Sequence, residues 1–182
     1  STSSGRIRSD KNLYLNNSID ILFEYIKSRF SLSQDLYNIY GHSAGAQFVH
    51  RYLLLSNEPK VKTAVAANAG WYTFLDGANF PYGLSNPPIN FESSNVRDFL
   101  KMDLHVLIGS ADTEITSSVN QSKGANNQGL NRFQRANNFY NYTERIVKQN
   151  NLEFNWSFQI VKGVAHSNSR MSKAAAEIIL TN

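Results

Sequence analysis

The 182-residue sequence contains no cysteine. This absence excludes disulfide bonds, thiolate metal sites and a cysteine nucleophile, and it is compatible with either redox compartment. Long apolar runs are missing as well, so the sequence has no candidate membrane span and no apolar stretch of a secretory signal near its start. These absences assign no compartment to the protein.

Clusters of like charge are also missing. The formal net charge is +4 and the pI is about 9.3, but the lysine and arginine residues are scattered and are not interleaved with aromatic residues. Scattered charge favours a solvated surface over a nucleic-acid footprint, so we expect no nucleic-acid partner. The four histidines show no metal-ligand spacing, and we expect no metal site.

What the sequence does contain is a regular alternation of helical and strand patterns. Helices are expected at residues 16–30, 46–55, 94–101, 131–149 and 171–180. Strands are expected at residues 36–40, 61–68, 104–108 and 154–161. This alternation predicts an α/β fold with a mostly parallel sheet flanked by helices on both faces. In such sheets, sites lie beyond the carboxyl ends of the strands.

The length and composition bound the domain organisation. A chain of 182 residues with 41% hydrophobic residues can bury a sizeable core in one domain. We expect residues 1–15 to form a flexible segment and residues 16–182 to form a single domain. The polar stretch 110–129 is either a lid or a long surface insertion. Arg132 and Arg135, which follow it, are expected to face solvent or to cap nearby loops.

The most informative motif is Gly-His-Ser-Ala-Gly at residues 41–45, which has the form G-x-S-x-G. It lies between an expected strand and an expected helix, and this context is typical of a nucleophile elbow that presents Ser43 above the sheet. Side chains at Gly41 and Gly45 are expected to collide with the neighbouring strand and helix. The alternative interpretation is an ordinary glycine-rich turn between a strand and a helix.

An elbow serine requires a base to accept its proton. His166 follows the strand that ends near residue 161, at the same sheet edge as the elbow. The other histidines are placed less well, because His105 lies within a strand, His42 within the elbow and His50 within the following helix. His166 is therefore the predicted base, and the alternative is a histidine on a surface loop.

The base in turn requires an acid that orients it. Asp112 follows the strand at 104–108, which gives the chain order Ser, Asp, His that is typical of this type of site. Asp103 precedes that strand and so belongs to the wrong end of the sheet. Glu114 remains an alternative acid, and Asp112 itself has the alternative role of a turn-forming aspartate.

Acyl transfer also requires donors for an oxyanion. The N–H group of Ala44, at the start of the elbow helix, is one predicted donor. A second donor is expected in a loop after an early strand, but no strand is expected before residue 16. Trp71 and Tyr72, together with Phe80 and Tyr82, line an acyl or aromatic pocket or else pack in the core and loops.

These segments together resemble the α/β-hydrolase superfamily, and in particular bacterial esterases of the polyhydroxybutyrate-depolymerase and feruloyl-esterase type. The residues that carry the resemblance are 40–48, 66–72, 109–113 and 163–166. The resemblance covers about residues 16–182 and implies Ser43 as nucleophile, His166 as base and Asp112 as acid. Members of the superfamily begin with several strands and an oxyanion loop, which this sequence lacks before the helix expected at 16–30.

The sequence therefore predicts a serine hydrolase that cleaves a carboxylic ester through an acyl-enzyme and needs no cofactor. The expected partner is a small-molecule or polymeric ester. One alternative is a non-catalytic hydrolase-like binding module. Another is a thioesterase, peptidase or acyltransferase that uses the same three side chains.

Overall fold

The computed structural model describes residues 15–87 and 93–181. Its centre is a four-stranded sheet in the order β1-β2-β3-β4, in which every neighbouring pair is parallel. The strands are β1 (Tyr37–His42), β2 (Val61–Ala67), β3 (Leu104–Gly109) and β4 (Trp156–Val161). Because all four strands run the same way, their carboxyl ends meet at one edge of the sheet.

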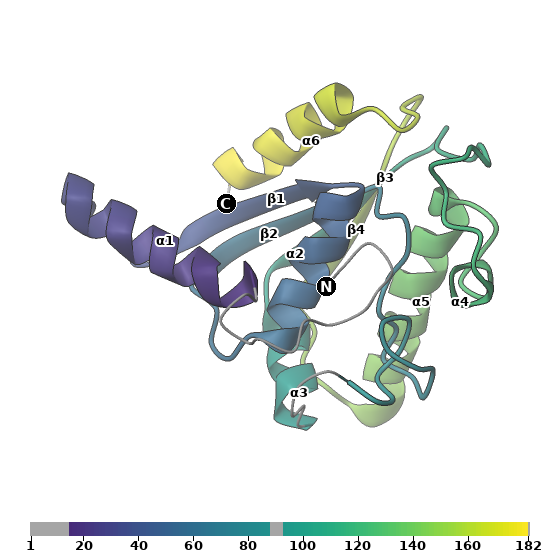
Figure 1. Ribbon diagram of the computed structural model, residues 1–182, viewed down its shortest axis with the longest axis horizontal. Coiled ribbons are helices and arrows are strands. Elements are labelled where there is room, and N and C mark those ends of the chain that lie inside the picture. The colour runs from purple at the N-terminus through teal and green to yellow at the C-terminus, as the bar shows by residue number, and fades with distance from the viewer. Residues whose placement is uncertain (1–14, 88–92, 182) are drawn as a thin grey trace.

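Helices cover both faces of this sheet (Figure 1). The longer helices are α1 (Leu15–Phe30), α2 (Ala44–Leu55), α5 (Arg132–Asn150) and α6 (Asn168–Thr181), and the shorter ones are α3 (Ser93–Lys101) and α4 (Lys123–Asn126). Helix α6 packs on β1, β2 and β3 on one face, whereas α2 contacts β1 and β2 and α5 contacts β3 on the other. The predicted α/β fold, with a parallel sheet between helical layers, is confirmed.

The two faces of the sheet have separate apolar cores. The larger core joins α2, α3 and α5 to the sheet, and its aromatic centre is Phe139, which stacks on Tyr72 with 4.4 Å between ring centroids. The smaller core lies under α6 and includes Val65, Leu107 and Met171. Strands β2 and β3 are buried on both faces, which explains their nearly continuous apolar sequences.

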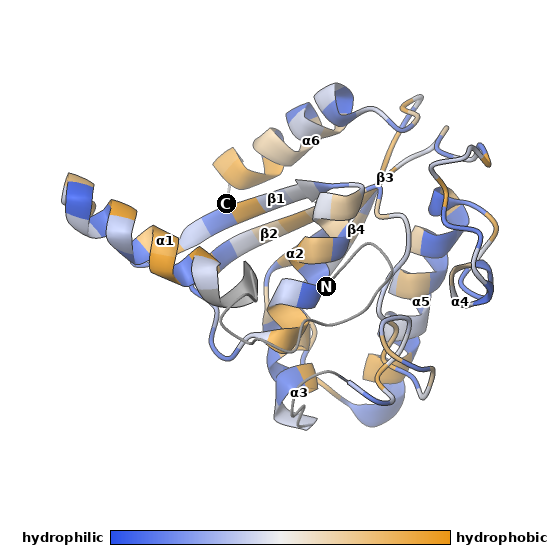
Figure 2. Ribbon diagram, viewed as in Figure 1, coloured by the Kyte–Doolittle hydropathy of each residue, from blue (hydrophilic) through white to orange (hydrophobic). Residues whose placement is uncertain are grey.

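Helix α1 lies apart from these layers, at the end of the sheet where the strands begin (Figure 1). Phe23 packs on Tyr37, whose hydroxyl donates a hydrogen bond to Asp20. Several large side chains of α1 nevertheless remain exposed, including Ile21 and Tyr25. Hydrophobic residues form orange bands along this helix in Figure 2. Among the described residues, β1 is an edge strand of the sheet.

The expected elements are all present, with shifted ends. Strand β1 runs through Gly41 and His42 into the elbow, and α2 begins at Ala44 rather than at residue 46. The short helix α4 was not expected from the sequence. The expected flexible segment 1–15 lies outside the described residues except for Leu15, and the assignment of residues 16–182 to one domain stays a prediction. None of the helices within residues 15–87 and 93–181 has the length and apolarity to cross a membrane.

Arg135 of α5 connects the polar segment 110–129 to α5 and to the loop after β2 through hydrogen bonds. Its guanidinium group donates hydrogen bonds to the carbonyl oxygens of Gly129 (2.7 Å), Gly70 (2.7 Å) and Asn120 (2.8 Å). Gln128 adds a second attachment, because its side chain binds the N–H and carbonyl groups of Tyr72. These contacts favour a fixed insertion over a movable lid.

The expectation that Arg132 and Arg135 face solvent is wrong, since they are 3% and 0% exposed. They do bind loop carbonyl groups, as the alternative expectation stated. A buried arginine is stable only where acceptors such as carbonyl oxygens pair with its N–H groups. Helical periodicity does not show whether other segments provide such acceptors, so the burial of these two arginines could not be predicted from it.

His50 is a buried titratable group in the larger core. Its Nε2 accepts a hydrogen bond from the N–H of Thr73 (3.1 Å), so its Nδ1 carries the proton and donates to the carbonyl of Ala46 (2.9 Å). Burial lowers the pKa of His50 to about 3. The neutral ring is therefore part of the fold, and protonation would remove the acceptor that Thr73 requires.

Replacement of Arg135 by Met should lower the free energy of unfolding by about 3 kcal/mol or more, because several buried acceptors lose their donor. The exposed Arg145 on the same helix is the matched control, and its replacement by Met should change stability by less than about 0.5 kcal/mol. Urea denaturation measures both. Equal effects of the two substitutions would contradict the role given to Arg135.

His50 should also make the protein sensitive to acid. Its folded pKa lies below the ordinary value of 6.5, so its stabilising contribution is complete above pH 6.5 and is lost as the pH falls toward about 3. In His50→Gln, the decline of the unfolding free energy in this window should be shallower by about 1.4 kcal/mol per pH unit. Denaturation curves at several pH values test this, and an unchanged slope would refute it.

Candidate active site

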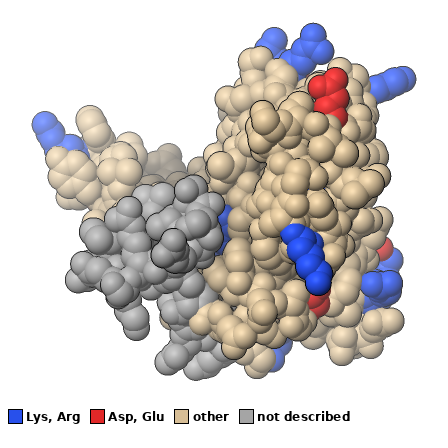
Figure 3. All heavy atoms as spheres, turned by 45° about the vertical axis from the view of Figure 1, so that its right-hand side comes forward, with Lys and Arg blue, Asp and Glu red and all other residues tan. Residues whose placement is uncertain are grey.

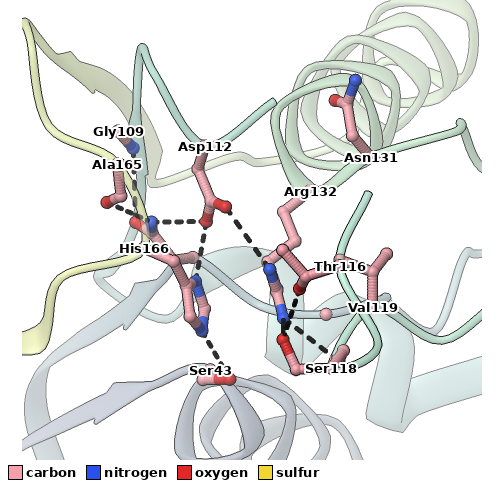
Figure 4. Close-up of polar contacts among 12 residues, drawn as sticks. Ser43, Gly109, Asp112, Thr116, Ser118, Val119, Asn131, Arg132, Ala165 and His166 are labelled. Atoms are coloured by element: carbon pink, nitrogen blue, oxygen red, sulfur yellow. Dashed lines mark hydrogen bonds and ion pairs between the residues drawn. The ribbon is translucent and has the colours of Figure 1, made fainter. Parts of the chain in front are cut away.

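The loops that follow β1, β3 and β4 bring Ser43, Asp112 and His166 together (Figure 4). The Nε2 atom of His166 lies 3.0 Å from the hydroxyl oxygen of Ser43, and its Nδ1 atom lies 2.8 Å from Oδ2 of Asp112. Each of these side chains is held at the carboxyl end of a different parallel strand. The rule that predicted a site at this edge therefore also explains how residues so distant in sequence come into contact.

The turn at Ser43 is strained. Ser43 has φ of 57° and ψ of −115°, a conformation that non-glycine residues rarely adopt, and α2 begins at the next residue. Gly41 makes the turn possible, because a Cβ atom at this position would lie 2.3 Å from the carbonyl oxygen of Gly45. This strand, strained serine and helix together have the form of the predicted elbow.

The expected collision at Gly45 is wrong. A Cβ atom placed on Gly45 meets no described atom within 4 Å, and Gly45 lies in the first turn of α2. The two glycines of the motif therefore differ in this structure: Gly41 is required by close packing, and Gly45 is not.

Two loops hold Asp112 and His166 against each other. The N–H of Ala111 donates to the carbonyl of Val164 (2.9 Å), and the N–H of Gly163 donates to the hydroxyl of Ser110 (2.8 Å). Gly109 permits this approach, since a Cβ atom there would lie 2.2 Å from the carbonyl oxygen of Val164. The distance between Asp112 and His166 is thus set by backbone contacts as well as by their own hydrogen bond.

Asp112 is a buried carboxylate with several donors around it. It is 3% exposed, and it accepts hydrogen bonds from His166, from Nδ2 of Asn68 (2.7 Å) and from Nη1 of Arg132 (3.4 Å). Burial acts to raise the pKa of this carboxyl, but the bond from His166 and the charges of His166 and Arg132 outweigh it, so the pKa lies below 3.8. Asp112 is therefore ionised at neutral pH.

An ionised Asp112 also fixes the tautomer of His166. The carboxylate can only accept, so Nδ1 of His166 carries the proton and Nε2 is left to accept from the hydroxyl of Ser43. This is the arrangement that a general base requires. His42 packs on the same imidazole with 4.6 Å between ring centroids, and burial lowers the pKa of His42 to about 4, so this neighbour is neutral at pH 7.

The structure places the alternative candidates elsewhere or at the margin. Glu114 is exposed two residues beyond Asp112, and no hydrogen bond joins it to His166. Asp103 precedes β3, at the opposite end of the sheet, and its Oδ1 lies 3.0 Å from Nε2 of His105. His50 is buried in the larger core. No group of three or more His, Asp or Glu side chains within the described ranges is arranged to hold a metal ion.

The predicted aromatic pair is divided between surface and core. Trp71 is half-buried, with the guanidinium carbon of Arg51 4.2 Å from its ring centroid and the ring of Tyr82 beside it. Tyr72 is 0% exposed and packs against Phe139, so its place is in the core. Only Trp71 of this pair has surface that a ligand can reach.

A hollow of about 210 Å³ lies beside Asp112 and His166. The other residues that line it are Ala111, Glu114, Thr116, Ser118, Arg132 and Ala165. On the face in Figure 3, the Lys and Arg side chains lie in several separate places, and Asp and Glu side chains lie near some of them.

Sequence reasoning missed Asn68 and Arg132 as neighbours of Asp112. Asn68 directly follows β2 and has φ of 52°, and Arg132 is the first residue of α5. A signal for Asn68 was present in the sequence, because it is a polar residue at the carboxyl end of an otherwise apolar strand. Arg132 gave no such signal, since arginine is common on exposed helix faces.

Comparisons with known proteins give two close structural relatives. Poly(aspartic acid) hydrolase-1 from Sphingomonas sp. KT-1 superposes with a TM-score of 0.89 and is 33% identical in sequence, over 98% of this chain and 67% of that one. LpqC, a poly(3-hydroxybutyrate) depolymerase from Bordetella parapertussis, superposes with a TM-score of 0.85 and is 28% identical, over 97% of this chain and 59% of that one. The chain thus spans about three fifths to two thirds of these relatives. No family model and no curated protein sequence matches it.

The two glycines of the elbow offer a paired test. Gly41→Ala should lower the unfolding free energy by about 1–3 kcal/mol or more, because its new methyl group overlaps the backbone of Gly45. Gly45→Ala should leave stability unchanged or raise it by up to about 1 kcal/mol, because alanine is the better helix former. Thermal or urea unfolding compares the two, and a Gly41→Ala protein as stable as the parent would contradict the geometry.

Proposed function

Because this chain belongs to the α/β-hydrolase superfamily, we propose that it is a serine hydrolase that cleaves carboxylic esters through an acyl-enzyme. The single observation that carries the proposal is the continuous hydrogen-bonded series from Ser43 through His166 to Asp112. No cofactor enters the proposed reaction.

In the first half-reaction, the hydroxyl oxygen of Ser43 attacks the ester carbonyl while Nε2 of His166 accepts its proton. Asp112 holds the imidazole in place and stabilises the positive charge that forms on it. The carbonyl oxygen becomes an oxyanion, for which the N–H of Ala44 at the start of α2 is the proposed donor. The protonated His166 then gives its proton to the departing alcohol, and the acyl group remains on Ser43.

In the second half-reaction, water takes the place of the alcohol. His166 removes a proton from the water, which attacks the acyl-enzyme, and the same imidazole returns the proton to Ser43 as the acid product leaves. The neutral state of His42, which packs on the imidazole, avoids a second positive charge beside the base. The half-exposed Trp71 is the proposed aromatic contact for the substrate.

The two relatives bear on the proposed substrate. One is described as a hydrolase of poly(aspartic acid) and the other as a depolymerase of poly(3-hydroxybutyrate), so together they support hydrolysis of ester or amide bonds. We favour a small or polymeric ester. The first relative favours an amide as the second candidate, and both reactions use the same nucleophile and base.

The proposal predicts that a fluorophosphonate probe labels Ser43 in the protein. Ser43→Ala should abolish labelling and lower the turnover of p-nitrophenyl esters by about 10⁴-fold or more, because the nucleophile is lost. Ser117 is an exposed serine in the loop beyond Asp112, and Ser117→Ala is the matched control that should retain both properties. Mass spectrometry locates the label, and absorbance follows turnover.

The competing interpretations give different results in the same assays. A binding module without catalysis leaves Ser43 unlabelled and shows no turnover with any substrate. A panel of esters, thioesters, p-nitroanilides and the two polymers separates an esterase from a thioesterase or an amidase. Unchanged ester turnover in Ser43→Ala, with no labelling of Ser43 in the parent protein, would reject the proposal.

A further inference from the structure

Asn68 forms hydrogen bonds with Asp112 and with the loops that precede Asp112 and His166. It follows β2, is 0% exposed, and has the left-handed backbone φ of 52° that turns its side chain toward the neighbouring loops. Its Nδ2 donates to Oδ2 of Asp112 (2.7 Å) and to the carbonyl of Ala165 (3.3 Å), and its Oδ1 accepts from the N–H of Gly109 (3.2 Å). One amide group therefore joins the acid loop to the residue that precedes His166.

The carboxylate of Asp112 is attracted by His166 on one side and by Arg132 on the other. Oδ2 accepts from Nδ1 of His166, and Oδ1 faces Nη1 of Arg132 at 3.4 Å (Figure 4). Arg132 is 3% exposed and is itself fixed by Ser118, so its charge is close and poorly screened. A second donor on Oδ2 opposes rotation of the carboxylate toward this arginine, and Asn68 is that donor.

We propose that Asn68 is a positioning residue of the hydrolase: its donated hydrogen bond holds Oδ2 of Asp112 in line with His166. The inference rests on the proposed function. The two ends of the amide group have different roles, because the Nδ2 donor acts on the reaction through Asp112, whereas the Oδ1 acceptor stabilises the local fold at Gly109.

Two substitutions distinguish these ends. Asn68→Asp keeps the shape, the tolerance of a left-handed backbone and the acceptor for Gly109, but its ionised form has no donor and faces the charge of Asp112. Asn68→Gly removes both ends and keeps the backbone freedom. Asn151→Gly is the matched control, because Asn151 has φ of 50° at the exposed end of α5, remote from the site.

The pH dependence of Asn68→Asp is the sharpest readout. Among the described residues, the charged or titratable groups near the new carboxyl group are Asp112, His166 and Arg132, together with His42, which packs on His166, and the buried Tyr72, which interacts with Asp112. At low pH the new carboxyl group is protonated and can donate to Asp112 in place of the amide. The ratio of variant to parent kcat should therefore fall by about 10- to 100-fold between about pH 6 and about pH 9, with KM unchanged.

The experiment measures kcat and KM for p-nitrophenyl acetate, the rate of fluorophosphonate labelling and the melting temperature of the four proteins. Asn68→Gly should lose about 10- to 100-fold in kcat at every pH, and Asn151→Gly should match the parent. If Asn68→Asp does not fold, the comparison of the two glycine variants decides.

Two outcomes would overturn the inference in different ways. A parent protein that is not labelled at Ser43 overturns the proposed function and this inference together. A labelled parent accompanied by an Asn68→Asp protein with parental kcat across the whole pH range, or by an Asn68→Gly protein as active as Asn151→Gly, overturns the positioning role alone.

Discussion

The buried carboxylate of Asp112 is the group on which the rest of the site depends. A carboxylate that is 3% exposed is stable in its charged form only if donors replace the water it has lost. The fold provides these donors from three segments: His166 after β4, Asn68 after β2 and Arg132 at the start of α5. The same bonds that stabilise the charge also fix the direction of the imidazole, so the stability of the charged Asp112 and the orientation of the His166 ring have one cause.

The parallel sheet makes this convergence possible. Its register aligns the carboxyl ends of all four strands, and the loops after them bring Ser43, which follows β1, and His166, which follows β4, together across β2 and β3. Two further contacts hold these loops in place. Gly109 allows the carbonyl of Val164 to pack closely against its backbone, and Arg135 donates hydrogen bonds to three loop carbonyl groups. The turn at Ser43 is strained, and the packed strand and helix on either side hold its unfavourable backbone conformation.

Much of this was accessible from the sequence, because strand and helix periodicity report burial and because sites in parallel sheets lie at strand ends. Together with the G-x-S-x-G motif and the chain order Ser, Asp, His, these two rules selected Ser43, Asp112 and His166, which the structure brings within hydrogen-bonding distance. Contacts between distant segments explain the burial of Arg135, which was wrongly expected to face solvent, and the place of Tyr72, which the sequence left open. Arg135 is buried because three carbonyl groups elsewhere accept its protons, and Tyr72 belongs to the core because Phe139 of α5 stacks on it. Local sequence contains no signal of either contact.

Asp112 sets the tautomer of His166 and so leaves Nε2 free to accept from Ser43. Nitrogen-15 NMR of histidine-labelled protein at neutral pH measures this directly, with His166→Gln used to assign the resonance. We expect a protonated Nδ1 and an unprotonated Nε2 for this ring, with the Nδ1 proton shifted to low field by its bond to the carboxylate. A ring protonated at Nε2, or one that exchanges freely between the two forms, would contradict it.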